Sequence, residues 1–224
     1  MSKEIELNTM FPHLFPNVQV SETEESFNEK KALEEYNKKQ YFKFCRKTGI
    51  PEKYDSYNFS NIDRSDKDFA IIVSKIEQWI KEPRKSLVFS GTYGSGKTLL
   101  GTIIARELKG KFVRCSYLIN EIKQGFSFSS KETVNEVISR YGKYPVLVLD
   151  ELGRGIKNAD DYSLLFQVIN ENIENDHILV IISNLSIQDI CKEMGNAMGD
   201  RLRDFFVINF TNLSFRGGVD RLKH

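Results

Sequence analysis

The feature that most constrains the fold is a glycine-rich stretch between an apolar run and a helix-like segment. Residues Phe89–Thr98 read FSGTYGSGKT and fit the pattern G-x-x-x-x-G-K-[ST] from Gly91 to Thr98. Ser86–Phe89 lead in as a strand, and Leu99–Ile104 lead out as a helix. Several backbone N–H groups meet an anion in such a bend, because no side chains block its approach. The stretch therefore predicts a loop that binds the phosphates of a nucleotide triphosphate.

Each position of this loop has an expected role. The Lys97 ammonium reaches the β- and γ-phosphates, and the Thr98 hydroxyl is a ligand for Mg²⁺. The alternative is a glycine-rich surface turn, which the preceding strand and the following helix disfavour. The predicted nucleotide contacts here are Gly91, Thr92, Tyr93, Gly94, Ser95, Gly96, Lys97, Thr98 and Leu99.

The rest of the chain after Ser65 alternates between short apolar runs and helical patterns. A helix that Asp66 or Ser65 caps carries apolar residues on one face and ends at Pro83. Nearly continuous Val, Ile, Leu and Phe in the strands is typical of a parallel sheet covered by helices on both faces, so an α/β domain is expected. The predicted strands are Ser86–Ser90, Lys111–Cys115, Val146–Asp150, Ile178–Ser183 and Phe206–Phe210, and the predicted helices are Lys97–Leu108, Tyr117–Lys123, Lys131–Tyr141, Tyr162–Asn175, Ile187–Met194 and Ala197–Asp204.

A second element of the site follows the third strand. The segment Tyr144–Gly153 reads YPVLVLDELG, and its carboxylates stand at the carboxyl end of a buried strand, where ligands of parallel sheets bind. Asp150 fits the Mg²⁺ role, and Glu151 fits the base that orients the attacking water. The interval of 150 − 98 = 52 residues between Thr98 and Asp150 leaves room for the Lys111–Cys115 strand, which predicts an extra strand between the two motif strands.

Polar residues near the last two strands complete the predicted site. Asn184 follows Ile178–Ser183, where its amide can bind the attacking water or the γ-phosphate; it also fits a plain turn before a helix. Arg201 precedes the last strand and is the predicted arginine that a neighbouring subunit supplies to the γ-phosphate, with a surface ion pair to Asp200 or Asp204 as the alternative. Arg203 is expected to point elsewhere, and Arg216 to contact phosphates in its own subunit.

Composition excludes several other classes of protein. No apolar run approaches the roughly 20 residues of a membrane span, and no secretory signal is visible, so the cytoplasm is expected. The 3 Cys and 3 His residues are scattered, which argues against a zinc site or a disulfide framework. The net charge of +1 predicts no polyanion partner but leaves room for a local basic face.

Taken in order, these motifs resemble an AAA+ ATPase, and their details resemble the DnaC/IstB branch. GIPEKYDSYNFSNI (Gly49–Ile62) is similar to the segment that leads into the ATPase core, LVLDELG to the Walker B motif, ISNLS to sensor 1, GDRLRD to the arginine-finger box and FRG to the closing arginine. The resemblance implies a P-loop NTPase of AAA+ type: a parallel sheet sandwiched by helices, without a full C-terminal helical lid. It implies an ATPase domain over residues 49–224 and a short, mainly helical, partner-docking region over residues 1–48.

The same resemblance implies cofactors, partners and function. ATP and Mg²⁺ bind between subunits that self-associate through the ATP site, and Glu151, Asn184 and Arg201 are the catalytic residues. The expected function is loading of a DnaB-type replicative helicase onto single-stranded DNA. Residues 105–145 carry 8 Lys/Arg and 4 Glu, net 8 − 4 = +4, with Phe126 and Phe128 as base-stacking candidates; buried phenylalanines and a solvated basic face are the alternative. An IstB-like transposase helper, a P-loop kinase and a non-hydrolysing adaptor stay open.

Overall fold

The computed structural model describes Leu33, Tyr36, residues 48–156 and residues 158–210. Most of the region 1–48, which is expected to be mainly helical, lies outside the described residues; within it, Leu33 and Tyr36 are helical and exposed. Arg216 also lies outside them. The proposed boundary between a docking region and an ATPase domain therefore stays a prediction.

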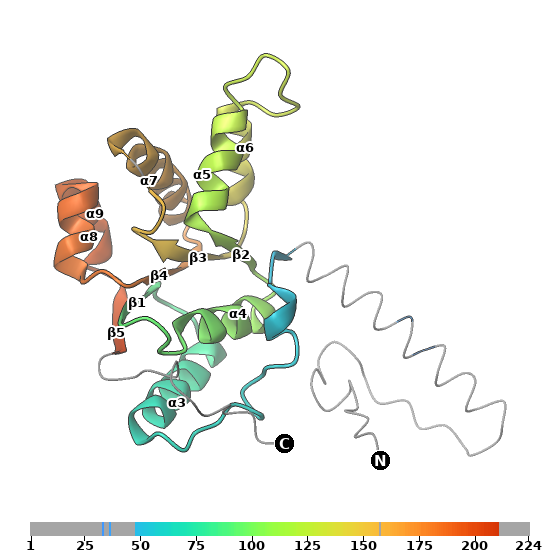
Figure 1. The fold of residues 1–224 in the computed structure, drawn as a ribbon, viewed down its shortest axis with the longest axis vertical. Helices are drawn as coiled ribbons and strands as arrows, with labels where there is room; N and C mark the ends of the chain where they lie inside the picture. Colours follow the sequence, from blue (N-terminus) through green and yellow to red (C-terminus); the bar gives the residue numbers. More distant parts are fainter. Residues whose placement is uncertain (1–32, 34–35, 37–47, 157, 211–224) are drawn as a thin grey trace.

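Five parallel strands of the described residues form one sheet, in the order β2-β3-β4-β1-β5 (Figure 1). The strand that lies between the two motif strands β1 and β3 is β4. The strand β2, which lies between them in the sequence, instead forms the edge beyond β3. The prediction of an extra strand between the motif strands is confirmed, but its assignment to Lys111–Cys115 is wrong, because the pairing depends on long-range contacts that local sequence does not encode. The bounds are β1 Leu87–Gly91, β2 Lys111–Arg114, β3 Val146–Leu152, β4 Ile178–Ser183 and β5 Phe206–Phe210.

Helices cover both faces of this sheet, which confirms the predicted α/β architecture (Figure 1). Alternate residues of each strand point to opposite faces, so the sheet divides the core in two. Phe89, Phe112 and Val148 pack with α3 and α4 on one face, whereas Val88, Val113 and Leu147 pack with the remaining helices on the other. The helices are α3 Lys67–Lys81, α4 Lys97–Glu107, α5 Cys115–Gln124, α6 Val134–Gly142, α7 Ala159–Glu174, α8 Ile187–Met194 and α9 Asn196–Leu202.

Capping groups account for several helix starts. The Asp66 side chain accepts a hydrogen bond from the Phe69 N–H (3.0 Å), so Asp66 rather than Ser65 caps α3. The α6 helix begins three residues later than expected, because Thr133 and Glu136 form a capping box. The β2 strand ends at Arg114, since Cys115 already begins α5.

One buried arginine attaches an irregular segment to the core. Arg106 on α4 is fully buried, and its guanidinium donates to the carbonyl of Tyr54 (2.9 Å) and to that of Tyr57. The short 3-10 helix η1, Glu52–Tyr54, and the chain after it are thereby held against α4. This matters for the site, because α4 also begins at the glycine-rich loop.

Candidate nucleotide-binding site

The glycine-rich loop connects the end of β1 to the start of α4. Gly94 and Gly96 have φ values of 74° and 89°, a left-handed conformation that residues with a Cβ rarely adopt. Gly96 occupies the N-cap position and has no side chain with which to cap α4. The first N–H groups of the helix therefore face the loop and can donate to an anion.

Lys97 lies inside the loop. Its side chain is buried, and its Nζ donates to the carbonyls of Gly91 (2.8 Å) and Thr92 (2.6 Å) and to the Ser95 hydroxyl (3.2 Å). These contacts hold the ammonium group against the backbone that would surround the phosphates. A positive charge is thus fixed where a phosphate bound in the loop would carry its negative charge.

Thr98 and Asp150 meet at the start of α4 and the end of β3. The Thr98 hydroxyl lies 3.2 Å from each carboxylate oxygen of Asp150, which is 2% exposed. Burial, and then the charge of Glu151, raise the pKa of Asp150 to about 6. Mg²⁺ in nucleotide sites is bound by one or two protein oxygens together with phosphates and water. This pair fits such an ion, which would offset the buried negative charge.

Glu151 stands next to this pair in an unusual backbone conformation. Its φ is 60°, which is uncommon for a residue with a side chain and is found most often at functional sites. Its carboxylate accepts a hydrogen bond from Arg154 Nη1 (2.8 Å) and lies 3.9 Å from Arg114 Nε. Asn184, which follows β4, lines the same cavity. Because β4 lies between β1 and β3, Asn184 just after the end of β4 lies between the glycine-rich loop and the carboxylates of Asp150 and Glu151.

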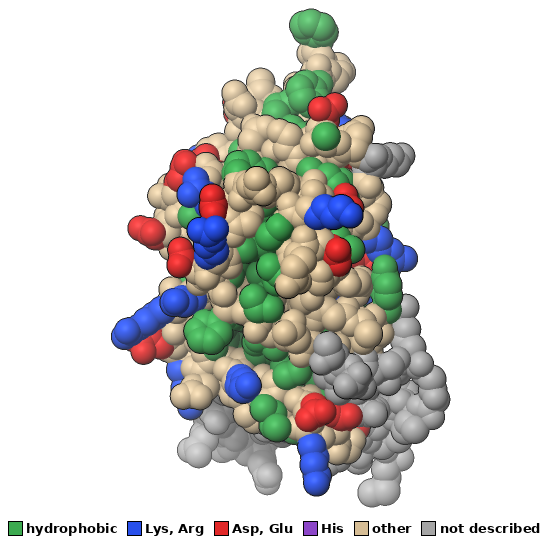
Figure 2. Space-filling view, turned by 90° about the vertical axis from the view of Figure 1, so that its left-hand side faces the viewer, with side chains coloured by type: hydrophobic (Ala, Val, Ile, Leu, Met, Phe, Trp, Pro, Cys, Tyr) green, Lys and Arg blue, Asp and Glu red, His purple; other side chains and the backbone are tan. Residues whose placement is uncertain are grey.

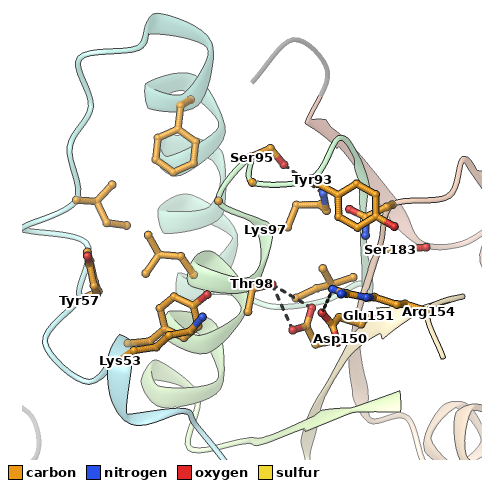
Figure 3. A pocket seen from close by; sticks show the side chains of 18 of the residues that line it. Lys53, Tyr57, Tyr93, Ser95, Lys97, Thr98, Asp150, Glu151, Arg154 and Ser183 are labelled. Carbon is orange, nitrogen blue, oxygen red and sulfur yellow. Dashed lines mark hydrogen bonds and ion pairs between the residues drawn. The ribbon is translucent and has the colours of Figure 1, made fainter. Parts of the chain in front are cut away.

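These groups open onto one cavity of about 370 Å³ (Figure 3), within the range of nucleotide-sized pockets. Ten predicted residues line it: Tyr93, Gly94, Ser95, Gly96, Lys97, Thr98, Leu99, Asp150, Glu151 and Asn184. Sequence reasoning missed the opposite wall and the arginine after β3, namely Lys53, Tyr54, Tyr57, Ile62, Asp63, Phe69 and Arg154. The signal in the sequence is the segment Gly49–Ile62, which resembles the segment leading into the ATPase core of the DnaC/IstB branch. That resemblance predicts no particular contact.

The other predicted residues lie elsewhere. Gly91 and Thr92 bind Lys97 through their carbonyls, and the Thr92 N–H and hydroxyl both donate to the Phe210 carbonyl (3.3 Å each). Arg201 on α9 is exposed and donates to Asn170 Oδ1 (2.7 and 3.1 Å), outside the cavity of its own chain. Arg203 pairs with Asp200 (3.2 Å).

The span 105–145 has a net positive charge in the sequence, but in the folded protein many of its basic side chains are paired or buried. Arg106 is buried, and Arg140 is bound by Glu121 (2.7 Å) and Glu132 (2.9 Å). Lys123 pairs with Asp161, and Arg114 faces Glu151. Four of the eight cations are thus committed to internal partners, while Phe126 and Phe128 are 67% and 110% exposed. On the face that Figure 2 shows, basic and acidic side chains are interspersed.

Replacing Asp150 with asparagine is expected to stabilise the nucleotide-free protein. A folded-state pKa of about 6, against an ordinary 3.8, means that ionised Asp150 costs folding free energy above pH 6 and that protonation relieves this cost as the pH falls toward 4. Asn cannot ionise and keeps an acceptor for Thr98. Denaturant unfolding should show a gain of about 1–3 kcal/mol at pH 7.5 for Asp150→Asn, shrinking at pH 5.

The matched control is Asp204→Asn, which changes an exposed carboxylate and is expected to leave stability unchanged. A loss of stability in Asp150→Asn at pH 7.5, or an equal gain at both pH values, would contradict the assignment of a destabilising buried charge.

Comparison with known proteins agrees with this geometry. A model of the family described as IstB-like ATP binding protein matches residues 21–224. The ATP-binding protein of insertion sequence IS232 from Bacillus thuringiensis subsp. berliner is 26% identical over 146 residues, which cover 60% of this chain and 57% of that protein. The chain thus spans a little over half the length of this curated relative.

Solved structures share the fold. A crystal structure of the DnaC helicase loader matches with a TM-score of 0.62 and 20% identity, covering 71% of this chain and 99% of that one. The AMPPCP-bound DnaA from Aquifex aeolicus matches with a TM-score of 0.61 and 14% identity, covering 71% of this chain and 50% of that one. Among the described residues, we find no helix that has the length and apolar character needed to cross a membrane.

Proposed function

Because the chain belongs to the IstB-like ATP-binding protein family, we propose that it is an AAA+ ATPase that loads a DnaB-type replicative helicase onto single-stranded DNA. The observation that carries the ATPase part is the meeting of Lys97, the Thr98–Asp150 pair and Glu151 in one cavity. A phosphate-binding loop, a Mg²⁺ ligand pair and a carboxylate base are the parts that hydrolysis of a nucleoside triphosphate requires.

Each residue has a role in the proposed mechanism. The loop N–H groups and Lys97 bind the phosphates, and Thr98 with Asp150 would hold Mg²⁺, which would neutralise phosphate charge. Glu151 accepts the proton of the attacking water, and the Asn184 amide orients that water. Tyr54, Tyr57 and Phe69, on the opposite wall, offer flat apolar surfaces to the base.

The site is completed by a second subunit in this proposal. Arg201 is exposed and does not line the cavity of its own chain, which suits an arginine that reaches the γ-phosphate of a neighbour. ATP then favours assembly, and hydrolysis favours release, provided that the two nucleotide states differ in subunit affinity. Residues 1–48 would dock the helicase in the cytoplasm.

Contact with single-stranded DNA is assigned to the loop between α5 and α6. Exposed Phe126 and Phe128 lie in this loop together with exposed Lys131, and base stacking on aromatic rings needs no particular sequence. The pairing of Lys123 and Arg140 with acidic residues leaves stacking, rather than net charge, as the main source of affinity there.

A transposition helper is the second candidate, and the IS232 relative favours it. It would use the same catalytic residues and differ only in the partner. The name of the matched family points the same way, whereas the DnaC structure, covered over 99% of its length, supports a loader.

Co-purification decides between these functions. Tagged protein with ATP is expected to retain a DnaB-type helicase, and its ATP hydrolysis is expected to rise severalfold with single-stranded DNA. Retention of a transposase and no helicase would replace the loader by the helper. Phosphorylation of a small molecule, without response to DNA, would instead indicate a kinase.

A further inference from the structure

The arginine that binds the Glu151 side chain in the cavity has no role in the mechanism above. Arg154 lies just after β3, and its backbone N–H donates to the Glu151 carbonyl (3.0 Å) in a tight turn. Figure 3 shows its side chain extending back into the cavity, with the guanidinium over Glu151. The turn fixes the backbone, while 58% of the side chain is exposed and free of tight packing.

Arg154 is the cation of the described cavity lining that lies at its catalytic end; Arg114 also lies 3.9 Å from the Glu151 carboxylate but does not line the cavity. Among the described lining residues, Lys97 is held by its own loop, and Lys53 lies 4.6 Å over the Tyr54 ring on the opposite wall. Arg154 instead binds the side chain of Glu151, at the end of β3 where Asp150 also stands. A terminal phosphate bound near Asp150 and Glu151 would therefore come close to this guanidinium.

We propose that Arg154 distinguishes a nucleoside triphosphate from a diphosphate by exchanging the Glu151 carboxylate for the γ-phosphate. This inference rests on the proposed ATPase function. A terminal phosphate carries more charge than a carboxylate and offers three oxygens to the planar donor fork of arginine. The exchange leaves the Glu151 carboxylate available to the attacking water, so that activation of the base follows from the presence of the γ-phosphate.

The contact between Arg154 and Glu151 is weak enough to be exchanged. An ion pair between partly exposed residues three apart contributes little, and solvent competes for both groups. The γ-phosphate contact would be formed in a more enclosed place, with two charge-assisted hydrogen bonds in place of one.

Calorimetric titration of Arg154→Ala with AMPPCP and with ADP tests the proposal without relying on hydrolysis. We expect the Kd for AMPPCP to rise by about 10-fold to 100-fold, the range for a charge-assisted hydrogen bond, while the Kd for ADP stays within about twofold. Arg154→Lys keeps the positive charge but loses the planar donor group of arginine, and its Kd for AMPPCP is expected to lie between those of the wild type and Arg154→Ala. The matched control is Arg84→Ala, since exposed Arg84 pairs with nearby Glu82 far from the cavity.

Glu151→Gln supplies a second, independent measurement. In Glu151→Gln, Arg154 has no ion pair to break before it binds the γ-phosphate. AMPPCP should therefore bind up to about fivefold more tightly to Glu151→Gln than to the wild type. The same change should give no gain in the Arg154→Ala background, because the two residues are coupled.

The outcomes separate this inference from the proposed function. If wild-type protein binds neither nucleotide, the proposed function fails. If wild-type protein binds both, but Arg154→Ala weakens AMPPCP and ADP equally, or neither, then only the role of Arg154 is overturned. An equal gain from Glu151→Gln with and without Arg154 also overturns it.

Discussion

Glu151→Gln is expected to slow ATP hydrolysis by about 100-fold to 10,000-fold, the usual effect of losing a general base, without weakening nucleotide binding. Glutamine has nearly the same shape but cannot accept the proton of the attacking water. Lys97, Thr98 and Asp150, which bind the phosphates and Mg²⁺ in our proposal, are left in place. Single-turnover hydrolysis and equilibrium binding, measured on the same preparation, separate the two effects.

Glu82→Gln is the control for this change, because it removes an exposed carboxylate that also pairs with an arginine close in sequence. It should leave hydrolysis unchanged. If Glu151→Gln hydrolyses ATP at the wild-type rate, Glu151 is not the base. If the wild type does not hydrolyse ATP at all, the protein is a nucleotide-dependent adaptor.

Arg201→Ala is expected to reduce hydrolysis by about 10³-fold to 10⁵-fold, the effect of removing an arginine finger, with little change in nucleotide binding by the monomer. The Arg201 side chain is bound to Asn170 on the surface and does not line its own cavity, so its effect has to cross to another subunit. Mixing Arg201→Ala with Lys97→Ala subunits tests this, because the second variant still offers Arg201 to the intact loop of the first. Partial recovery of hydrolysis in the mixture is the expected result.

Arg203→Ala is the matched control, since Arg203 stands two positions away in the sequence, is exposed and pairs with Asp200. It should hydrolyse ATP normally. A mixture as inactive as its two components would exclude action across a subunit boundary, and an equal loss in Arg203→Ala would point to damage to α9 rather than to a specific role of Arg201.

Local patterns were enough to predict the residues that line the loop end of the cavity. Gly94, Gly96 and Lys97 are neighbours in sequence, so the glycines, the lysine and the following helix specify the loop without reference to the rest of the fold. Asp150 and Glu151 follow from a buried strand that ends in acid, and parallel strands align their carboxyl ends at one edge. The α/β architecture follows from the alternation of apolar runs and helical patterns along the chain.

What the sequence did not predict depends on contacts between distant segments. Tyr57 becomes part of the cavity because Arg106, 49 positions later, binds its carbonyl. The cations Arg140 and Lys123 count toward a basic face in sequence, but acids on other turns and helices pair with them in space. The position of β4 between β1 and β3 likewise results from long-range pairing. Charge counts and local periodicity carry none of this information.

The attachment of Tyr54 and Tyr57 to Arg106 has a consequence for how the protein responds to its ligand. Since α4 bears Arg106 near one end and Lys97 and Thr98 at the other, this helix joins the wall opposite Asp150 and Glu151 to the glycine-rich loop, and the two are expected to move together. Nucleotides with the same base and different numbers of phosphates would contact these joined parts of the protein in nearly the same way. A conformational change that distinguishes the triphosphate from the diphosphate is therefore expected to begin at the carboxyl ends of β3 and β4.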